Sequence, residues 1–384
     1  MKTPALLAFF LAVCVAACAA ATPSLPAGFS ANRIATVGGA REMAFAPNGD
    51  LFVGTTGGDV YIVPHADGPG EPQAPHVFAH FDDAPAAGVV VANNSVYVGT
   101  QFGVWRIPYQ TGDQRARSAP QKLASVRTSG LSSDHVTTSV AFAKGVLYAS
   151  VGSSCNACQP ESDRTRATVG RIGDGTYTIV AHNIRNAIAL TVNENTGALW
   201  AGVAGEDDLP VGHPYEIFDE VTAHATPVNY GWPYCYENQR SNPVSRWAGH
   251  NCSDTPVPRV ILPAYETPIG ATFYPQHPQG RYAFPPSYAG GAFITLHGSW
   301  HGPPQGLSGY LPPRVVFVPM RGDVPARTAN WSDPSTQWSQ FAGGYQQDGT
   351  INRSDRPTGI AVGPQGDLFI SGDMAGAIYR IRHS

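Results

Sequence analysis

MAFAPNGDLFVG at residues 43–54 and IAVGPQGDLFISG at residues 360–372 are near-copies at opposite ends of the chain. After a short gap the first is followed by GDVYIV at 58–63, and the second by GAIYRI at 376–381. A strand, a Pro/Asn-Gly turn, a second strand, a glycine turn and a third strand make one antiparallel meander. Its presence at both ends predicts a ring built from repeats.

The same pattern recurs between these two ends. The further copies are SVYVGTQFGVWRI (95–107) after the apolar run GVVVA, SVAFAKGVLYASVG (139–152), AIALTVNENTGALWAGV (187–203), and GATFYP (270–275) with GGAFITLHG (290–298). Six copies leave about 60 residues per unit, enough for four strands and a loop. We therefore predict an all-β fold over residues 25–384, a six-bladed β-propeller of four-stranded antiparallel blades, with a β-sandwich as the alternative.

Two segments do not fit the simple repeat. The last copy has only three clear strands, so residues 29–37 are expected to return as its fourth strand and close the ring. Residues 205–268, between the fourth and fifth copies, are rich in Pro, Trp and Tyr, and we expect them to form a loop layer over one face.

The N-terminus predicts export. Met1-Lys2 and the apolar run 5–17 make a signal peptide within residues 1–21, because the run is too short to cross a bilayer as a mature helix. The stretch ending at Cys18 also resembles a bacterial lipobox, which would leave Cys18 as a lipidated N-terminus; plain cleavage is the alternative. The predicted location is periplasmic, or lipid-anchored at the cell envelope.

The net charge and the cysteine content bear on the class of ligand and on the redox state of the cysteines. The net charge of −4 and the lack of a basic cluster argue against nucleic acid. Export places the cysteines in an oxidising compartment. Four of them follow the signal region: Cys155, Cys158, Cys235 and Cys252. They allow three pairings, and we expect the local one, 155–158 with 235–252, in preference to a zinc site.

The repeat register locates candidate site residues. In a propeller, the residues just before each innermost strand converge on one mouth of the central channel. The polar groups at these positions are Arg41-Glu42, His135, Asn183 with Arg185-Asn186, and Asp355-Arg356. A histidine, arginines and carboxylates at one mouth predict a site for an anionic or polyoxygenated ligand.

Several motifs resemble the glucose/sorbosone dehydrogenase family. They are Arg185-Asn186 ahead of an apolar strand and TGALW, NYGWP at 229–233, and the closing RPTGIAVGPQG with IYRI. The resemblance covers about residues 40–384. It implies a soluble propeller that oxidises sugars with pyrroloquinoline quinone (PQQ) and calcium. SVGSSCNAC (150–158), GATFYP and LHGSWHG (296–302) are more similar to the L-sorbosone dehydrogenase branch.

The resemblance also implies residue roles. His135 matches the catalytic base, which takes a proton from a sugar hydroxyl while hydride leaves the same carbon; a pKa near its usual value of about 6.5 suits that task. Arg185 and Asn186 match the pair that flanks the quinone, where a fixed cation stabilises the growing negative charge. Arg356 matches an arginine that pairs with the cofactor carboxylates.

The implied calcium site uses main-chain oxygens. Gly205 and Glu206 align with the pair of residues whose backbone carbonyls hold the ion in the family. A hard cation takes carbonyl and quinone oxygens readily, and it polarises the quinone carbonyl.

The chain departs from the family pattern at two places. The family often places a lysine on the fifth blade, but the only lysines after the signal region are Lys122 and Lys144, and Ser299, Trp300 or His301 stands there instead. Where relatives have a second arginine after Arg356, this chain has Thr358. Arg41 or Arg164 would have to compensate.

These observations predict an exported quinoprotein that oxidises an aldose or sorbosone-like sugar and passes electrons to an external acceptor. One alternative is a calcium-dependent, lactonase-like hydrolase, which needs carboxylate ligands on the axis; the candidates are Glu42, Asp207 and Asp208. The other is a non-catalytic binding module, which the missing lysine and arginine favour.

Overall fold

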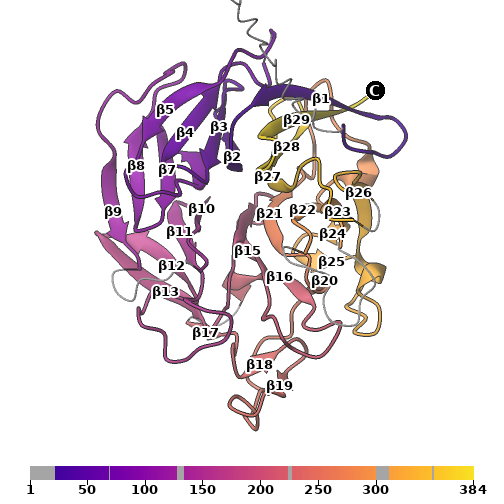
Figure 1. Ribbon diagram of the computed structural model, residues 1–384. Coiled ribbons are helices and arrows are strands. Elements are labelled where there is room, and N and C mark those ends of the chain that lie inside the picture. Colours follow the sequence, from indigo (N-terminus) through magenta and orange to yellow (C-terminus); the bar gives the residue numbers. More distant parts are fainter. Residues whose placement is uncertain (1–21, 69, 128–133, 224–226, 300–310, 348–349) are drawn as a thin grey trace, which may run out of the picture.

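The computed structural model describes residues 22–68, 70–127, 134–223, 227–299, 311–347 and 350–384. Their strands form six larger sheets, each with four antiparallel strands, that are arranged as the blades of a ring (Figure 1). The inner strand of each blade lies beside the inner strands of the two neighbouring blades, so the ring is continuous. The prediction of a six-bladed propeller is confirmed.

The first three blades follow the chain without interruption. Blade one contains β2 (Ala40–Phe45), β3 (Leu51–Thr55), β4 (Asp59–Val63) and β5 (His76–His80). Blade two contains β6 (Gly88–Ala92), β7 (Ser95–Thr100), β8 (Gly103–Pro108) and β9 (Gln121–Ser125). Blade three contains β10 (Thr138–Ala143), β11 (Val146–Val151), β12 (Thr168–Gly173) and β13 (Thr176–His182), and the short β17 (Val228–Asn229) pairs in parallel with β13.

The last three blades contain the long connections. Blade four contains β14 (Ala189–Asn193), β15 (Ala198–Val203), β16 (Glu216–Glu220) and β20 (Val260–Leu262). Blade five contains β21 (Pro268–Phe273), β22 (Ala292–Leu296), β23 (Arg314–Val318) and β26 (Ser339–Ala342). Blade six contains β27 (Pro357–Val362), β28 (Leu368–Gly372), β29 (Ala377–His383) and β1 (Phe29–Thr36). The remaining elements are the hairpins β18 (Cys235–Tyr236) with β19 (Arg240–Ser241) and β24 (Met320–Arg321) with β25 (Val324–Pro325), and the 3-10 turns η1 (Val221–Ala223), η2 (Pro286–Tyr288) and η3 (Pro334–Gln337).

The ring closes where the two ends of the chain meet. β1 pairs antiparallel with β29, from Phe29 opposite His383 to Thr36 opposite Ala377. In Figure 1 the indigo β1 lies along the yellow β29. The expectation that the segment 29–37 supplies the fourth strand of the last blade is therefore confirmed.

The insert 205–268 differs in part from its expected loop layer. It supplies β16 and β20, which are the two outer strands of blade four. Both strands are largely buried, since Phe218 and Val260 pack with Trp200 of β15 in one apolar cluster. They are the third and fourth strands of the blade, so without them blade four would have only β14 and β15. The rest of the insert is loops, η1, β17 and the β18–β19 hairpin.

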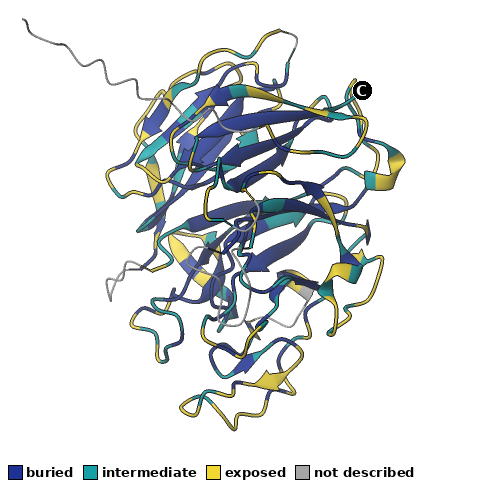
Figure 2. Cartoon of the chain, turned by 45° about the vertical axis from the view of Figure 1, so that its right-hand side comes forward, coloured by how far each residue is buried: buried dark blue, intermediate teal, exposed yellow. Residues whose placement is uncertain are grey.

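The hydrophobic core lies between the blades rather than at a single centre. Phe52 and Phe78 of blade one, for example, pack against Val96 and Val98 of blade two. Burial is accordingly concentrated in the strands and exposure in the connecting loops (Figure 2). Packing of this kind stiffens the ring and leaves the loops at its mouths available for function.

Two disulfides have the expected local pairing, Cys155–Cys158 and Cys235–Cys252. The predicted signal peptide and Cys18 lie outside the described residues. Across the described ranges, no helix combines the length and the apolar character that crossing a membrane requires.

Candidate functional site

The starts of the inner strands approach one another at one mouth of the channel. A Cβ on Gly359 of β27 would lie 2.2 Å from the carbonyl oxygen of Arg41 in β2, and one on Gly270 of β21 would lie 2.1 Å from that of Thr358. The segments that precede these strands therefore share this mouth, as the repeat register predicts. Two clusters of polar residues lie here, one on blades three and four and one that spans blades five, six and one.

The blade 3–4 cluster is built around His135, ahead of β10. His135 has a positive φ of 46°, a left-handed conformation that is uncommon for a residue other than glycine. The buried Arg127 holds it there, because its Nη2 donates to the carbonyl oxygens of His135 at 2.7 Å and Thr137 at 2.6 Å.

Hydrogen bonding assigns the tautomer of the His135 ring. Its Nδ1 lies 3.0 Å from both the carbonyl oxygen and the Oγ of Ser153. A carbonyl only accepts, and Oγ donates its own proton to the carbonyl of Cys155 at 2.7 Å. Nδ1 must therefore carry the proton, which leaves Nε2 with a lone pair. The ring is arranged as a proton acceptor.

Burial, together with the positive charges of Arg185, Arg166 and Arg127, lowers the pKa of His135 to about 3. This differs from the sequence-based expectation of an ordinary value near 6.5. The reason is physical: desolvation and nearby cations both disfavour the imidazolium. The ring is consequently neutral throughout the physiological pH range.

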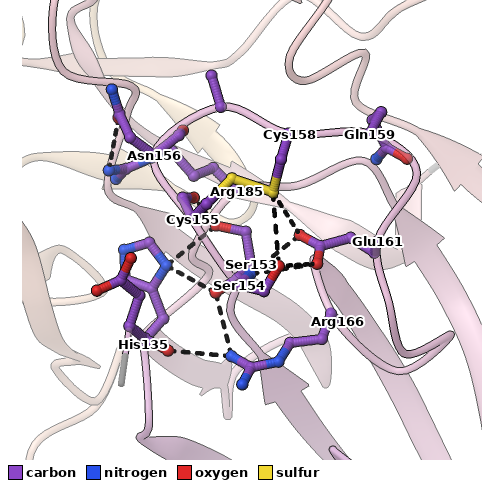
Figure 3. The surroundings of a disulfide bond; sticks show 12 residues. His135, Ser153, Ser154, Cys155, Asn156, Cys158, Gln159, Glu161, Arg166 and Arg185 are labelled. Carbon is purple, nitrogen blue, oxygen red and sulfur yellow. Dashed lines mark hydrogen bonds between the residues drawn. A yellow bond between two sulfur atoms is a disulfide. The ribbon is translucent and has the colours of Figure 1, made fainter. Parts of the chain in front are cut away.

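Arg185 precedes β14 and is 8% exposed in its side chain. Its Nε donates to the main-chain oxygen of Asn156 at 3.0 Å, and its Nη2 donates to Asn156 Oδ1 at 3.0 Å and to Asp207 Oδ2 at 3.2 Å. Figure 3 shows Arg185, His135 and the Cys155–Cys158 disulfide around one loop. The guanidinium is thus a fixed cation beside a neutral base.

Asn186 follows directly and is also buried. A Cβ on Gly152 would lie 2.5 Å from the Cβ of His135 and 2.6 Å from Asn186 Oδ1. Only a glycine at this position lets the histidine and the amide approach from either side. His135, Arg185 and Asn186, which we predicted to lie together, are brought together by blades three and four.

The second group, the blade 5–6–1 cluster, contains Arg356. Its Nε and Nη2 donate to the carbonyl oxygens of His297 at 3.0 Å and Gly298 at 3.2 Å. Desolvation by burial, and less strongly the neighbouring cations Arg353 and Arg41, lower the pKa of Arg356 to about 10; Asp373 acts in the opposite direction. This arginine remains charged at neutral pH.

Arg41 enters the same cluster through a β-bulge. The pairing of β2 with β3 shifts register between Ala40 and Met43, and bulges of this kind redirect side chains. Arg41 Nη1 then lies 3.3 Å from Asp373 Oδ2, which also lies 3.0 Å from His297 Nε2. Arg41, which we named as a compensating cation, therefore lies in this cluster, whereas Arg164 is exposed.

Ser299 is buried in the same region, but its side chain is engaged with the backbone. Its Oγ accepts from the N–H of Leu311 at 3.1 Å, and its carbonyl oxygen accepts from Arg353 Nη2. The structure thus brings a third arginine, Arg353, next to Arg356. Trp300 and His301 lie outside the described residues.

Gly205 and Glu206, the predicted calcium ligands, lie next to Arg185, whose Nη1 approaches the carbonyl of Ala204 at 3.4 Å. Gly205 N donates to Glu216 Oε2 at 2.6 Å, and Glu206 Oε2 accepts from Asn242 at 3.0 Å. Burial raises the pKa of both Glu206 and Glu216 to about 7. This oxygen-rich surrounding is chemically suited to a hard cation.

Sequence reasoning missed Arg127, Arg166, Arg353 and Asn156. Arg166 is buried and donates to the carbonyls of Asp134 at 3.0 Å and Ser153 at 3.1 Å. These side chains mostly bond backbone carbonyls, so they form no spacing motif. Arg353 had the clearest signal, since it stands three residues before Arg356 in NRSDRP.

Comparisons with known proteins bear on this site. A family model described as TrAA12-like matches residues 23–384. The iodide structure of the Trichoderma reesei family AA12 enzyme superposes with a TM-score of 0.78 at 18% identity, over 94% of this chain and 98% of that one. The calcium structure of the same enzyme gives 0.77 at 18% identity, over 94% and 97%.

A third solved structure is similar over nearly its whole length. The holo form of the pyranose dehydrogenase PQQ domain from Coprinopsis cinerea has a TM-score of 0.75 at 17% identity, over 94% of this chain and 97% of that one. No curated protein matches the chain. At these identities the structural matches establish the fold.

Proposed function

The chain belongs to the TrAA12-like family, and from that premise we propose that it is an exported quinoprotein that oxidises an aldose or a sorbosone-like sugar with PQQ and calcium. Its membership bears out the resemblance to the soluble PQQ-dependent sugar dehydrogenases. The observation that carries the proposal is the neutral imidazole of His135, with its lone pair on Nε2, beside the buried guanidinium of Arg185.

His135 is the base in this proposal. Its Nε2 takes the proton of the sugar hydroxyl while hydride leaves the carbon that bears it, and Ser153 holds the ring from the Nδ1 side. A base with so low a pKa is weak. Neutralising Arg185 with an anionic ligand removes part of the positive field at His135, and so raises its pKa towards the range that suits proton transfer.

The cations at the mouth suit a tricarboxylate. Arg356, Arg353 and Arg41 lie in one cluster and would hold the carboxylates, while Arg185 and Asn186 would flank the quinone. Gly205 and Glu206 would hold calcium through their carbonyls. When bound, PQQ supplies the two-electron acceptor and calcium the Lewis acid. Arg353 and Arg41 would stand in for the arginine and lysine that this chain lacks.

The calcium-dependent hydrolase is less well supported. That chemistry needs side-chain ligands, and within the described ranges no three His, Cys, Asp or Glu side chains are grouped to hold a metal ion. The non-catalytic binding module shares the fold and differs only in activity. We further propose that residues 1–21 direct export, and that Cys18 is the point of membrane attachment if the segment is processed as a lipoprotein signal rather than by plain cleavage.

Reconstitution tests the proposal. Purified protein with added PQQ and calcium should reduce a redox dye when it is offered aldoses or sorbosone-like aldehydes, and a chelator should abolish dye reduction until calcium is restored. A lactone hydrolysis assay run in parallel examines the hydrolase. Absence of dye reduction with every sugar, together with an unchanged PQQ spectrum, would rule out the dehydrogenase. A PQQ spectral change without turnover would indicate the binding module.

A further inference from the structure

Asn156 accepts two of the hydrogen bonds that the Arg185 guanidinium donates, whereas Ala204 and Asp207 accept one each. Its main-chain oxygen accepts from Arg185 Nε, and its Oδ1 accepts from Arg185 Nη2, both at 3.0 Å. The guanidinium is therefore bound at two edges by one residue. A planar guanidinium gripped in this way has its orientation fixed as well as its location.

Asn156 is in turn held from several sides. Its main-chain oxygen also accepts from Trp232 Nε1 at 3.2 Å, and its Oδ1 accepts from the N–H of Asp207 at 2.8 Å. Its Nδ2 donates to the carbonyl of Asp207 at 3.1 Å. The NYGWP motif thus supports the loop through Trp232. Every polar atom of the Asn156 side chain is used.

The Cys155–Cys158 disulfide encloses Asn156 in a short covalent loop. At its start, the carbonyl of Cys155 accepts from Ser153 Oγ, the same residue that orients the His135 ring. At its end, Glu161 accepts from Ser154 Oγ at 2.5 Å and lies 3.9 Å from Cys158 Sγ. One tied loop therefore supports both the base and the cation, as Figure 3 shows.

The choice of an amide has an electrostatic consequence. Asn156 holds Arg185 without neutralising it, and the one carboxylate partner, Asp207, is 39% exposed in its side chain, so solvent screens it. The charge of Arg185 stays available to a ligand and to His135. Among the described residues, the charged groups that lower the pKa of His135 most are Arg185, Arg166 and Arg127.

We propose that Asn156 is a positioning residue that fixes Arg185 next to His135, and that the Cys155–Cys158 bridge keeps Asn156 in place. The effect on turnover rests on the proposed function. The effect on the titration of His135 does not, because it is a property of the protein without cofactor.

The first test is a double-mutant cycle read by NMR titration of the His135 imidazole, with the full mature protein in the absence of PQQ. Asn156→Ala removes the Oδ1 acceptor of Arg185 Nη2 and keeps only the main-chain bond to Nε. The guanidinium should then be free to turn away, which raises the His135 midpoint in the same direction as Arg185→Ala. Combined with Arg185→Ala, Asn156→Ala should add nothing, because Asn156 acts only through that arginine. A purely structural role would give additive effects, or no change in the midpoint, and would overturn the proposal.

Two variants control for folding and chemistry. Asn156→Asp keeps both acceptor oxygens and so keeps Arg185 in place, but its carboxylate offsets the charge of Arg185 and should raise the His135 midpoint, with circular dichroism confirming the same fold. Gln159→Ala removes another amide from the same loop, one that bonds Asn183 at 3.2 Å rather than Arg185, and should leave the midpoint unchanged. With PQQ and calcium present, Asn156→Ala should lower kcat roughly 10- to 100-fold with a smaller change in KM.

The second test addresses the bridge. Cys155 and Cys158 are partly exposed, whereas Cys235 and Cys252 are buried, so a mild phosphine reductant should open the first disulfide selectively. Thiol labelling with mass spectrometry would verify this. Selective reduction, or the Cys155→Ser and Cys158→Ser double variant, should raise the His135 midpoint as Asn156→Ala does. An unchanged midpoint after verified reduction would overturn the role of the bridge, whatever the enzyme assay shows.

Discussion

The blade 3–4 cluster and the blade 5–6–1 cluster each pair a histidine with arginines at the same mouth, but they use the histidine in opposite ways. The ring of His135 donates to a backbone carbonyl, and no described residue is bonded to its Nε2, whereas the Nε2 of His297 is engaged 3.0 Å from Asp373. Arg185 is held mainly by neutral acceptors, whereas Arg41 faces the carboxylate of Asp373.

The two clusters differ in whether a carboxylate faces the histidine: Asp373 faces His297, whereas a backbone carbonyl faces His135. Burial lowers the pKa of both histidines, to about 3 for His135 and about 4 for His297, although Asp373 partly opposes the effect at His297. A carboxylate partner makes a histidine part of the scaffold, and a carbonyl partner leaves it available as a base. The blade 3–4 cluster is therefore suited to proton transfer and the blade 5–6–1 cluster to holding an anion.

Exchanging each histidine for glutamine should separate these roles most strongly. His135→Gln removes the base and should lower kcat by roughly 10²- to 10⁴-fold, with PQQ binding largely retained. His297→Gln keeps a donor for Asp373 and should cost less than about 10-fold. The measurements are steady-state dye reduction and fluorescence titration of PQQ. Equal losses of kcat in the two variants would contradict the proposal that only His135 acts as the base.

Alanine at the two arginines should separate turnover from affinity. Arg185→Ala removes a fixed cation beside the reacting atoms and should lower kcat by about 10²- to 10³-fold at saturating PQQ. Arg356→Ala removes a carboxylate contact and should weaken PQQ binding about 10- to 100-fold, while kcat at saturation changes little. Dye assays measure kcat and PQQ titrations measure affinity for both variants. A loss of affinity in Arg185→Ala with a loss of kcat in Arg356→Ala would contradict our assignment of roles.

Acid should destabilise the protein partly through His297. Its pKa is about 4 in the folded state and about 6.5 when unfolded, so between these values the unfolded chain binds more protons and stability is lost as the pH falls. The expected loss in the free energy of unfolding between pH 7 and pH 4.5 is on the order of 2 kcal/mol. Urea unfolding should show a smaller loss for His297→Gln.

His80→Gln is the matched control for that measurement. His80 is an exposed histidine that lies 2.7 Å from Asp59, and this partner raises its pKa. Its removal should leave the acid sensitivity in place. The same sensitivity in wild-type protein and His297→Gln would mean that His297 is not a source of it.

The fold was predictable because its repeats are local. Each copy carries its own strands and turns, and even the return of β1 to the last blade followed from a missing strand. The outer strands β16 and β20 of blade four were not predicted, because they are separated by a long irregular segment and match no copy. Their pairing is decided by tertiary contact with β15.

The site residues could be predicted from sequence only where they directly precede the inner strand of a repeat. His135, Arg185, Asn186 and Arg356 all precede inner strands, so the repeat located them. The lowered pKa of His135 was not predictable, because its largest cause is desolvation in the folded ring, and because Arg166 and Arg127 add to the effect of Arg185 from positions outside the register. Every residue has a main-chain carbonyl, so an arginine that bonds to one requires no particular residue type at the accepting position, and no sequence motif results.

Closure of the ring by β1 and β29 also distinguishes the two clusters by how far apart in sequence their contacts are. Arg185 and Asn156 are 29 residues apart in sequence, so the blade 3–4 cluster can form as soon as its two blades exist. Arg41 and Asp373 are 332 residues apart and meet only when the first and last blades join. The contacts around Arg185 therefore lie within two neighbouring blades, whereas the contact between Arg41 and Asp373 exists only in the closed ring, so anion binding by the blade 5–6–1 cluster depends on closure.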